Sequence, residues 1–207
     1  MANTQAALVT VTTAEAAFVA GLSPRQVQKA IDAGPVRPAL AHGRRVLDEA
    51  DLVYLTAMKT LAGKLKPVAR GSFYEALKKS GLETGAVSLA ATFGHDIKSN
   101  FAAVRERLER LRQLHELVER RNGTAVIKGT TIEAHRIAAL LAAGVTAERV
   151  LADHPSLDRD QVMAAADYAA AHPKAGRPFP ARSVKQAFDE AGLDGLADVL
   201  DARRQPR

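Results

Sequence analysis

Apolar residues recur at intervals of three and four along most of the chain, which is the spacing of helices that bury one side. Near the amino terminus the pattern is interrupted at Gly21 and again at Gly34, so it predicts two short helices joined by a tight turn. In the second of these helices, Val27, Ala30 and Ile31 form the apolar side. The two helices therefore have the pattern of a helix-turn-helix unit.

The next part of the chain predicts a hairpin and two more helices. Residues 37–46 are rich in turn-forming residues, and Asp48 is the expected N-cap of the helix that follows them. A long helix is predicted from Ser99 to about Arg121, whereas residues 86–97 have a mixed pattern that fits one or two strands.

A second cluster of short helices follows. A strand near residues 125–128 precedes three helices that are divided at Gly144 and Pro155. The predicted fold is therefore mainly α with small β elements, a winged helix-turn-helix followed by a second trihelical domain. The predicted segments are the first domain at 1–62, a connecting region at 63–121, the trihelical domain at 122–173 and a tail at 174–207.

Composition and charge add constraints on partners and location. The chain has 207 residues, no cysteine and a net charge of +6. Without cysteine, disulfides and thiolate metal sites are excluded. The positive charge favours a polyanionic partner, although it also serves solubility alone. No apolar run approaches the roughly 20 residues of a membrane span, and no signal peptide is recognisable, so we expect a cytoplasmic protein that binds no membrane.

Polar residues on the second helix and at the hairpin tip are suited to DNA. Arginine and glutamine pair with guanine and adenine edges in the major groove, and arginines on a hairpin contact phosphates. The alternative is that all of these are ordinary solvated side chains. The predicted DNA-binding residues are Arg25, Gln26, Gln28, Lys29, Arg44 and Arg45.

This segment, residues 13–61, resembles the winged helix-turn-helix of MerR-family regulators. The resemblance rests on the turn Gly21-Leu22-Ser23-Pro24-Arg25, on Ala33-Gly34-Pro35-Val36 after the second helix, and on the wing sequence Gly43-Arg44-Arg45-Val46-Leu47. It implies that the second helix reads bases and that the wing contacts the DNA backbone. His42 departs from the family pattern, because bulkier polar residues are common at that place in the wing.

Residues 122–173 resemble a helical domain that is found in VapB-like antitoxins of type II toxin–antitoxin pairs. Its opening motif I-x-G-T-R-I stands here as Ile127-Lys128-Gly129-Thr130-Thr131-Ile132, with Thr131 in place of the usual arginine. Asp153-His154-Pro155-Ser156-Leu157 and Asp167-Tyr168-Ala169 match later parts of the pattern. The resemblance implies an antitoxin whose partner is a cognate toxin protein, such as a PIN-type ribonuclease.

The resemblance also implies that the carboxy-terminal segment wraps around the toxin. The alternative is that its apolar stripe folds back on the protein itself. The predicted toxin-binding residues are Lys174, Arg177, Phe179, Arg182, Lys185 and Phe188. A homodimer is also expected, because apolar residues of the long helix alternate by three and four, as in a seam shared by two helices. The predicted dimerisation residues are Phe101, Val104, Leu108 and Leu111.

These features predict a homodimeric antitoxin that binds operator DNA, represses its own operon and neutralises a toxin. The alternative is a stand-alone MerR-like regulator that responds to a small ligand. We expect no enzyme, because neither the pair His95-Asp96 nor Glu133 with His135 is accompanied by a nucleophile or a phosphate-binding loop. His135 and His154 lack a matched ligand set, so we expect neither a metal nor a cofactor.

Overall fold

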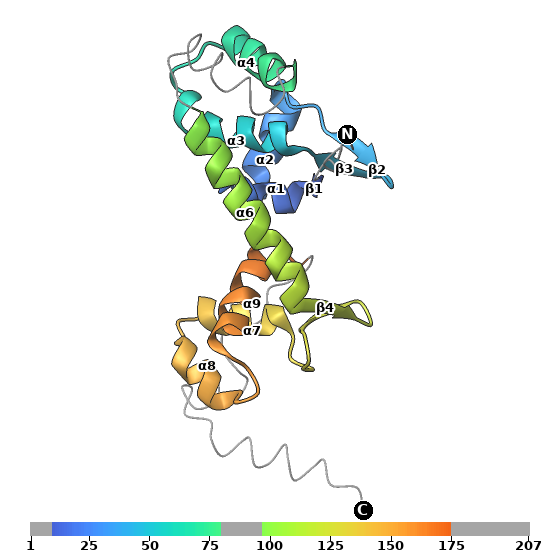
Figure 1. Ribbon diagram of the computed structural model, residues 1–207, viewed down its shortest axis with the longest axis vertical. Coiled ribbons are helices and arrows are strands. Elements are labelled where there is room, and N and C mark those ends of the chain that lie inside the picture. The colour runs from blue at the N-terminus through green and yellow to red at the C-terminus, as the bar shows by residue number, and fades with distance from the viewer. Residues whose placement is uncertain (1–9, 80–96, 175–207) are drawn as a thin grey trace, which may run out of the picture. The chain divides into compact units, whose positions relative to one another are not determined.

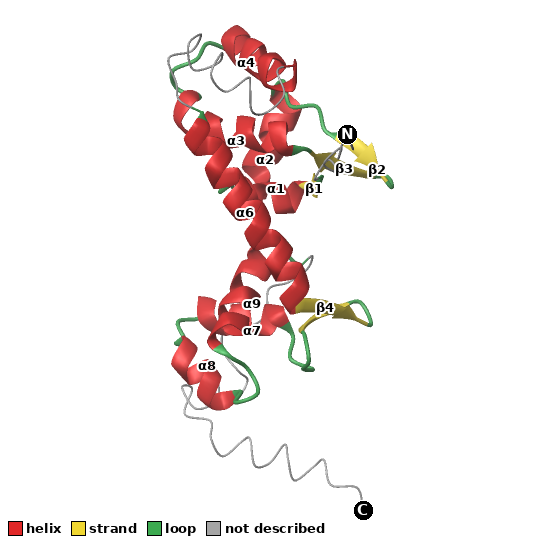
Figure 2. Ribbon diagram, in the orientation of Figure 1, coloured by secondary structure: helices red, strands yellow, loops and turns green. Residues whose placement is uncertain are grey.

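Helices dominate the computed structural model of this chain, which describes residues 10–79 and 97–174 (Figure 1). Within these ranges strands form one three-stranded and one two-stranded sheet, both small (Figure 2). The prediction of a mainly α fold with small β elements is confirmed. The chain divides into an amino-terminal unit, residues 1–116 with 170–173, and a second unit, residues 117–169 with 174–207.

In the described residues of the amino-terminal unit, five helices accompany the three-stranded sheet. Its elements in chain order are β1 (Val11–Thr12), α1 (Thr13–Ala20), α2 (Pro24–Ala33), β2 (Ala39–Ala41), β3 (Arg44–Leu47), α3 (Glu49–Leu61), α4 (Pro67–Lys79) and α6 (Lys98–Leu117). Helix α1 packs against both α2 and α3, and α3 packs against α4. Val27 of α2, Leu47 of β3 and Leu52 of α3 are completely buried in the core that these contacts enclose.

Reciprocal capping boxes begin the first three helices. The pairs are Thr12 with Glu15, Ser23 with Gln26, and Asp48 with Asp51. In each pair the N-cap side chain accepts a hydrogen bond from the N3 backbone, and the N3 side chain accepts one from the N-cap backbone. The predicted cap at Asp48 is confirmed, and Thr12 and Ser23 cap α1 and α2.

The predicted hairpin is also confirmed and forms a wing beside the helix-turn-helix. Strand β3 pairs antiparallel with β1 on one side and with β2 on the other. Val11 lies opposite Leu47, and both are buried, which attaches the base of the wing to the core. The tip is formed by His42 and Gly43, which both have positive φ, 51° and 72°. A two-residue loop of this kind matches the twist of the hairpin strands.

Helix α6 is shorter than predicted, because it ends at Leu117 and residues 118–121 form a strand instead. Among the residues predicted to form a dimer seam, Phe101, Val104 and Leu111 are buried within the chain, and Leu108 is half-buried. Buried side chains contribute no area to a dimer, so we do not propose this seam further. Residues 86–97, where a mixed pattern was predicted, lie outside the described residues except for Ile97. Among the described helices, none has the length and apolar composition to cross a bilayer.

The second unit begins with a hairpin and continues with three helices. Its elements are β4 (Val118–Arg121), β5 (Thr124–Ile127), α7 (Ala134–Ala142), α8 (Ala147–Asp153) and α9 (Arg159–Ala171), the last of which ends in residues assigned to the amino-terminal unit. Ile137, Val150 and Val162 lie in its core and are almost fully buried. Leu140 and Leu151 are half-buried.

The motif from Ile127 to Ile132 forms a closed turn at the start of this trihelical unit. Gly129 has a φ of 78°, in the left-handed region that favours glycine. The Thr130 hydroxyl donates to the Ile127 carbonyl at 2.8 Å and accepts from the Ile132 amide at 3.1 Å. The Ile127 amide in turn donates to the Ile132 carbonyl at 2.9 Å. The Gly-Thr pair is therefore structural, whereas the side chain of Thr131 is exposed.

Candidate nucleic-acid interface

Helix α2 presents a polar face opposite its buried side. Val27 is completely buried, and residues two positions away on either side of it point outward because each residue of a helix turns by about 100°. Arg25 and Lys29 occupy those positions, and both are exposed. Asp32, one turn beyond, is exposed on the same side. The outward face of α2 thus carries two cations and one carboxylate.

Gln28 and the wing are connected through Asp32. The Gln28 Nε2 donates to the Asp32 Oδ1 at 2.7 Å, and the same oxygen lies 3.9 Å from the Arg45 Nη1 on β3. Asp32 therefore joins two of the predicted DNA-binding residues, one on each element. Sequence reasoning did not include it, although its place four residues after Gln28 on a helix is a usable signal.

Gln26 is placed differently from the other predicted residues of α2. Its Oε1 accepts hydrogen bonds from the Ser23 backbone amide at 2.8 Å and from the Ser23 hydroxyl at 2.9 Å. The side chain also lines a cleft with Met58 and Ala62 of the α3 segment. It is exposed, yet its carbonyl is used to start the helix, so only its amide NH₂ is available to a base.

The wing carries two arginines and one exposed leucine. Arg44 and Arg45 are both exposed on β3, beside the turn at His42 and Gly43. Leu40 lies opposite Arg45 in the hairpin and is 76% exposed, which is unusual for a large apolar side chain. The surface formed by the outward face of α2 and this hairpin is called the α2–wing surface below. It contains Arg25, Gln28, Lys29, Asp32, Leu40, Arg44 and Arg45.

A charged network holds α4 against the start of α3 and reaches the segment that leads into the wing. Asp51 is 1% exposed and accepts from the Tyr74 hydroxyl at 2.8 Å. The Lys78 Nζ lies 2.8 Å from the same Asp51 oxygen and 2.7 Å from the Asp48 Oδ2. The Tyr74 oxygen in turn accepts from the Arg37 backbone amide at 3.2 Å. The segment that leads into the wing is therefore held to α3 and α4.

Burial and charge shift the pKa values inside this network. Burial alone would lower the pKa of Lys78, but its hydrogen bonds to Asp48 and Asp51 outweigh burial and raise the pKa well above its ordinary value. Burial raises the pKa of the Tyr74 hydroxyl, and the Arg37 amide opposes this shift while Asp51 adds to it. Lys78 therefore stays protonated and pairs with the buried carboxylate.

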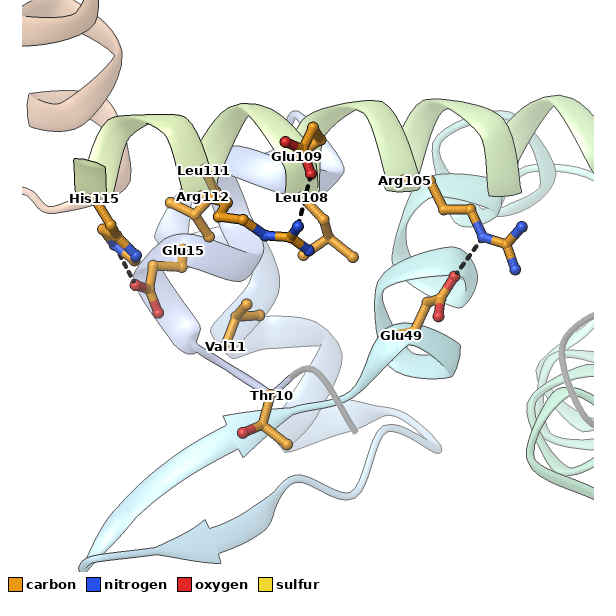
Figure 3. Close-up of a pocket in the computed structure, with 10 residues that line it drawn as sticks. All are labelled: Thr10, Val11, Glu15, Glu49, Arg105, Leu108, Glu109, Leu111, Arg112 and His115. Atoms are coloured by element: carbon orange, nitrogen blue, oxygen red, sulfur yellow. Dashed lines mark hydrogen bonds and ion pairs between the residues drawn. The ribbon is translucent and has the colours of Figure 1, made fainter. Parts of the chain in front are cut away.

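A separate cleft lies between α6 and the base of the sheet. It has a volume of about 440 Å³ and is lined by residues of β1, α1, α3 and α6 (Figure 3). Arg105 pairs with Glu49 across it at 3.2 Å, and Arg112 pairs with Glu109 at 3.2 Å. Leu108, from the predicted seam, lines the cleft as well. The cleft is therefore charged at its rim and partly apolar inside.

The predicted toxin-binding residues fall almost wholly outside the described residues. Only Lys174 is described, and its Nζ lies 3.3 Å from the Glu133 Oε2 at the start of α7. Arg177, Phe179, Arg182, Lys185 and Phe188 lie outside the described ranges. The pair His95-Asp96 also lies outside them. The structure brings Arg25, Gln28, Lys29, Arg44 and Arg45 to one surface and leaves the tail as a sequence prediction.

Comparisons with protein families and with curated proteins both give a match to part of this chain. Residues 118–169 match the model of a family described as "Protein of unknown function (DUF433)". A stretch of 76 residues is 40% identical to the uncharacterized protein y4eO of Sinorhizobium fredii (strain NBRC 101917 / NGR234). The match covers 35% of this chain and 34% of that protein, so this chain spans about a third of its relative's length. No solved structure matches the chain.

Proposed function

We propose that this protein is a DNA-binding regulator that reads its operator with α2 and holds the adjacent backbone with the wing. The single observation that carries the proposal is the α2–wing surface. Four exposed cationic side chains, Arg25, Lys29, Arg44 and Arg45, lie there, and the carboxylate of Asp32 is 3.9 Å from Arg45. The major groove of DNA is wide enough to admit an α-helix, and a hairpin beside that helix can contact the flanking phosphates.

Substitutions on the two elements separate base reading from backbone binding. Arg25→Ala should reduce the preference for the DNA upstream of the protein's own gene over random DNA, by about 1–3 kcal/mol if it pairs with one base. Fluorescence anisotropy with both duplexes measures the ratio. Lys79→Ala, which removes an exposed charge at the end of α4, is the control and should leave the ratio unchanged. An unchanged ratio in Arg25→Ala would contradict base reading by α2.

We further propose that the regulator is the antitoxin of a type II pair. The match of residues 118–169 to a domain family and the motif Ile127 to Ile132 support this assignment. The tail from residue 174 would then bind the toxin, with Arg177 and Phe179 among its contacts. Such a toxin is expected to be a small ribonuclease, because the cationic tail suits an active site built from carboxylates.

Truncation after Pro173 separates this role from DNA binding. The shortened protein keeps every described residue of the α2–wing surface, so it should bind DNA as the full chain does. It should fail to co-purify with the product of the neighbouring small gene, which the full chain captures. A truncated protein that still captures that product would overturn the assignment of the tail.

The charged cleft under α6 favours a second candidate function, that of a regulator responding to a small ligand. The cleft is large enough for a small molecule. Its rim carries positive charges from Arg105 and Arg112 and a negative charge from Glu49. In that case a ligand should change the affinity for DNA with no partner protein present. Arg105→Ala should abolish the change while leaving the affinity of the free protein for DNA unaltered.

A further inference from the structure

Three side chains from distant parts of the sequence meet within the amino-terminal unit. They are Glu15 of α1, His115 of α6 and His172, which follows α9. The Nε2 atoms of the two histidines are 3.0 Å apart. The Glu15 Oε1 lies 3.4 Å from the His115 Nε2 and 3.7 Å from the His172 Nε2. Two imidazoles and one carboxylate thus direct one atom each to a common point.

Glu15 is fixed in this place by its second role at the start of α1. Its Oε2 accepts from the Thr12 amide at 2.7 Å and from the Thr12 hydroxyl at 2.8 Å. The capping box therefore occupies one carboxylate oxygen and leaves Oε1 toward the histidines. The side chain is 11% exposed, so a mostly buried carboxylate faces the two imidazoles. A carboxylate oriented in this way by hydrogen bonds to its other oxygen is typical of a metal ligand.

The three distances match one face of a coordination tetrahedron. With metal–ligand bonds of about 2.0–2.1 Å, adjacent ligand atoms of a tetrahedron lie about 3.3 Å apart. The measured separations of 3.0, 3.4 and 3.7 Å are centred on that value. A proton between the two histidines satisfies one nitrogen pair, whereas a cation satisfies the lone pairs of all three atoms at once.

We propose that Glu15, His115 and His172 bind a divalent transition-metal ion, for which Zn²⁺ is the best match. Two imidazoles and a carboxylate are ligands that zinc accepts, and zinc tolerates three protein ligands with solvent in the fourth position. The side chains of His115 and His172 are 49% and 26% exposed, which leaves that position accessible (Figure 3 shows Glu15 and His115). Two positive charges lie close to these ligands in sequence, and both are paired with carboxylates, Arg112 with Glu109 and Lys174 with Glu133.

The metal would join three segments of the amino-terminal unit. Glu15 belongs to the first helix of the helix-turn-helix, and α1 packs directly on α2. Binding to the folded state alone stabilises it by RT ln(1 + [L]/Kd), so the ion should raise the melting temperature. This proposal does not depend on DNA binding, because the site lies on other residues than the α2–wing surface.

Zinc titration of the full chain, purified in the presence of a chelator and then freed of it, tests the proposal. We expect one Zn²⁺ per chain by calorimetry, a higher melting temperature with the ion, and visible absorption bands of tetrahedral type when Co²⁺ replaces Zn²⁺. His115→Ala and His172→Ala should each weaken binding by at least about tenfold, since even the loss of residues that orient ligands has effects of that size.

Two further variants keep the result interpretable. Glu15→Gln should lose affinity yet keep the fold, because Gln26 occupies the equivalent place in the α2 capping box of this same chain. His42→Ala removes an exposed histidine of the wing and should bind Zn²⁺ as the wild type does. Absence of stoichiometric binding, or binding that is equally strong in the His115, His172 and Glu15 variants with circular dichroism unchanged, would overturn the proposal.

Discussion

Asp51 is an almost fully buried carboxylate with three hydrogen-bonding groups around it, the Asp48 amide, the Tyr74 hydroxyl and the Lys78 ammonium. One oxygen takes part in the capping box of α3, and the other meets the Tyr74 hydroxyl and the Lys78 ammonium. Buried charges are tolerated when they are paired and hydrogen-bonded, and removing one partner leaves a cost behind. Asp51 therefore connects the start of α3 to α4 and, through Tyr74, to the segment before the wing.

Lys78→Met tests this coupling at the level of one side chain. The substitution keeps the alkyl stem but leaves Asp51 without its cation, so we expect the free energy of unfolding to fall by about 2 kcal/mol. Urea denaturation followed by circular dichroism measures the change. Lys79→Met, on an exposed neighbouring position, should cost less than about 0.5 kcal/mol. Equal effects of the two substitutions would show that the network contributes no stability.

The turn at Gly129 gives a second prediction for a single residue. Apart from its chain neighbours, no atom of the described residues lies within 4 Å of where a Cβ would stand at Gly129, so the φ of 78° is what opposes substitution. Gly129→Ala should therefore lower the stability of the second unit by about 1–2 kcal/mol. Thermal unfolding measures it, with Gly63→Ala as a control at an open glycine without positive φ. A smaller effect at Gly129 than at Gly63 would contradict this reading.

At the scale of elements, Asp32 is the unexpected member of the α2–wing surface. It places a negative charge among cations that would approach phosphates, and it holds both Gln28 and Arg45. A unit charge about 6 Å from a phosphate contributes about 0.7 kcal/mol in a water-like dielectric. Under the proposed function, Asp32 would therefore weaken non-specific attraction to DNA while it positions two of the predicted DNA-binding side chains.

Asp32→Asn should raise the affinity for random DNA by roughly threefold, the equivalent of that energy. The preference for operator DNA should fall at the same time, because Gln28 and Arg45 lose their shared anchor. Anisotropy titrations with both duplexes separate the two effects. Asp160→Asn, at the start of α9, changes the net charge equally and should alter neither quantity. Unchanged affinity for random DNA in Asp32→Asn would show that α2 does not approach phosphates.

The elements that local signals define were predictable from the sequence. Three such signals depend only on residues close in sequence, and each marks an element boundary in the structure: Ser23-Pro24, Asp48 and the turn at His42-Gly43. Contacts between distant residues were not predictable. Periodic apolar positions in α6 look the same whether they face a second copy or the same chain, and the structure buries Phe101 and Val104 within the chain.

The same limit applied to the sites. Helix periodicity places Arg25, Gln28 and Lys29 on the outward side of α2, and the short hairpin leaves Arg44 and Arg45 exposed beside it. Gln26 departs, because its amide oxygen is drawn into a capping box that spacing alone does not distinguish from an exposed face. The group of Glu15, His115 and His172 was missed, since His115 and His172 are 57 residues apart in sequence and no motif links them.

At the scale of the whole molecule, the family match and the structure agree on one boundary. The second unit begins at residue 117 and the matched region at residue 118, where β4 starts to pair with β5. Sequence analysis placed the boundary after residue 121, because the helical periodicity of α6 continues into Val118. Because Val118 pairs with Ile127 in the β4–β5 hairpin, strand β4 belongs to the second unit.

The central claim is that the α2–wing surface binds DNA, and the salt dependence of binding tests it most directly. Each phosphate contact contributes about 0.9 to the slope of log affinity against log salt concentration. The double variant Arg44→Ala, Arg45→Ala should therefore show a slope smaller by about 1.8 than the wild type, with Lys79→Ala unchanged. A wild-type protein that binds no DNA at low salt, or a double variant with the wild-type slope, would contradict the account.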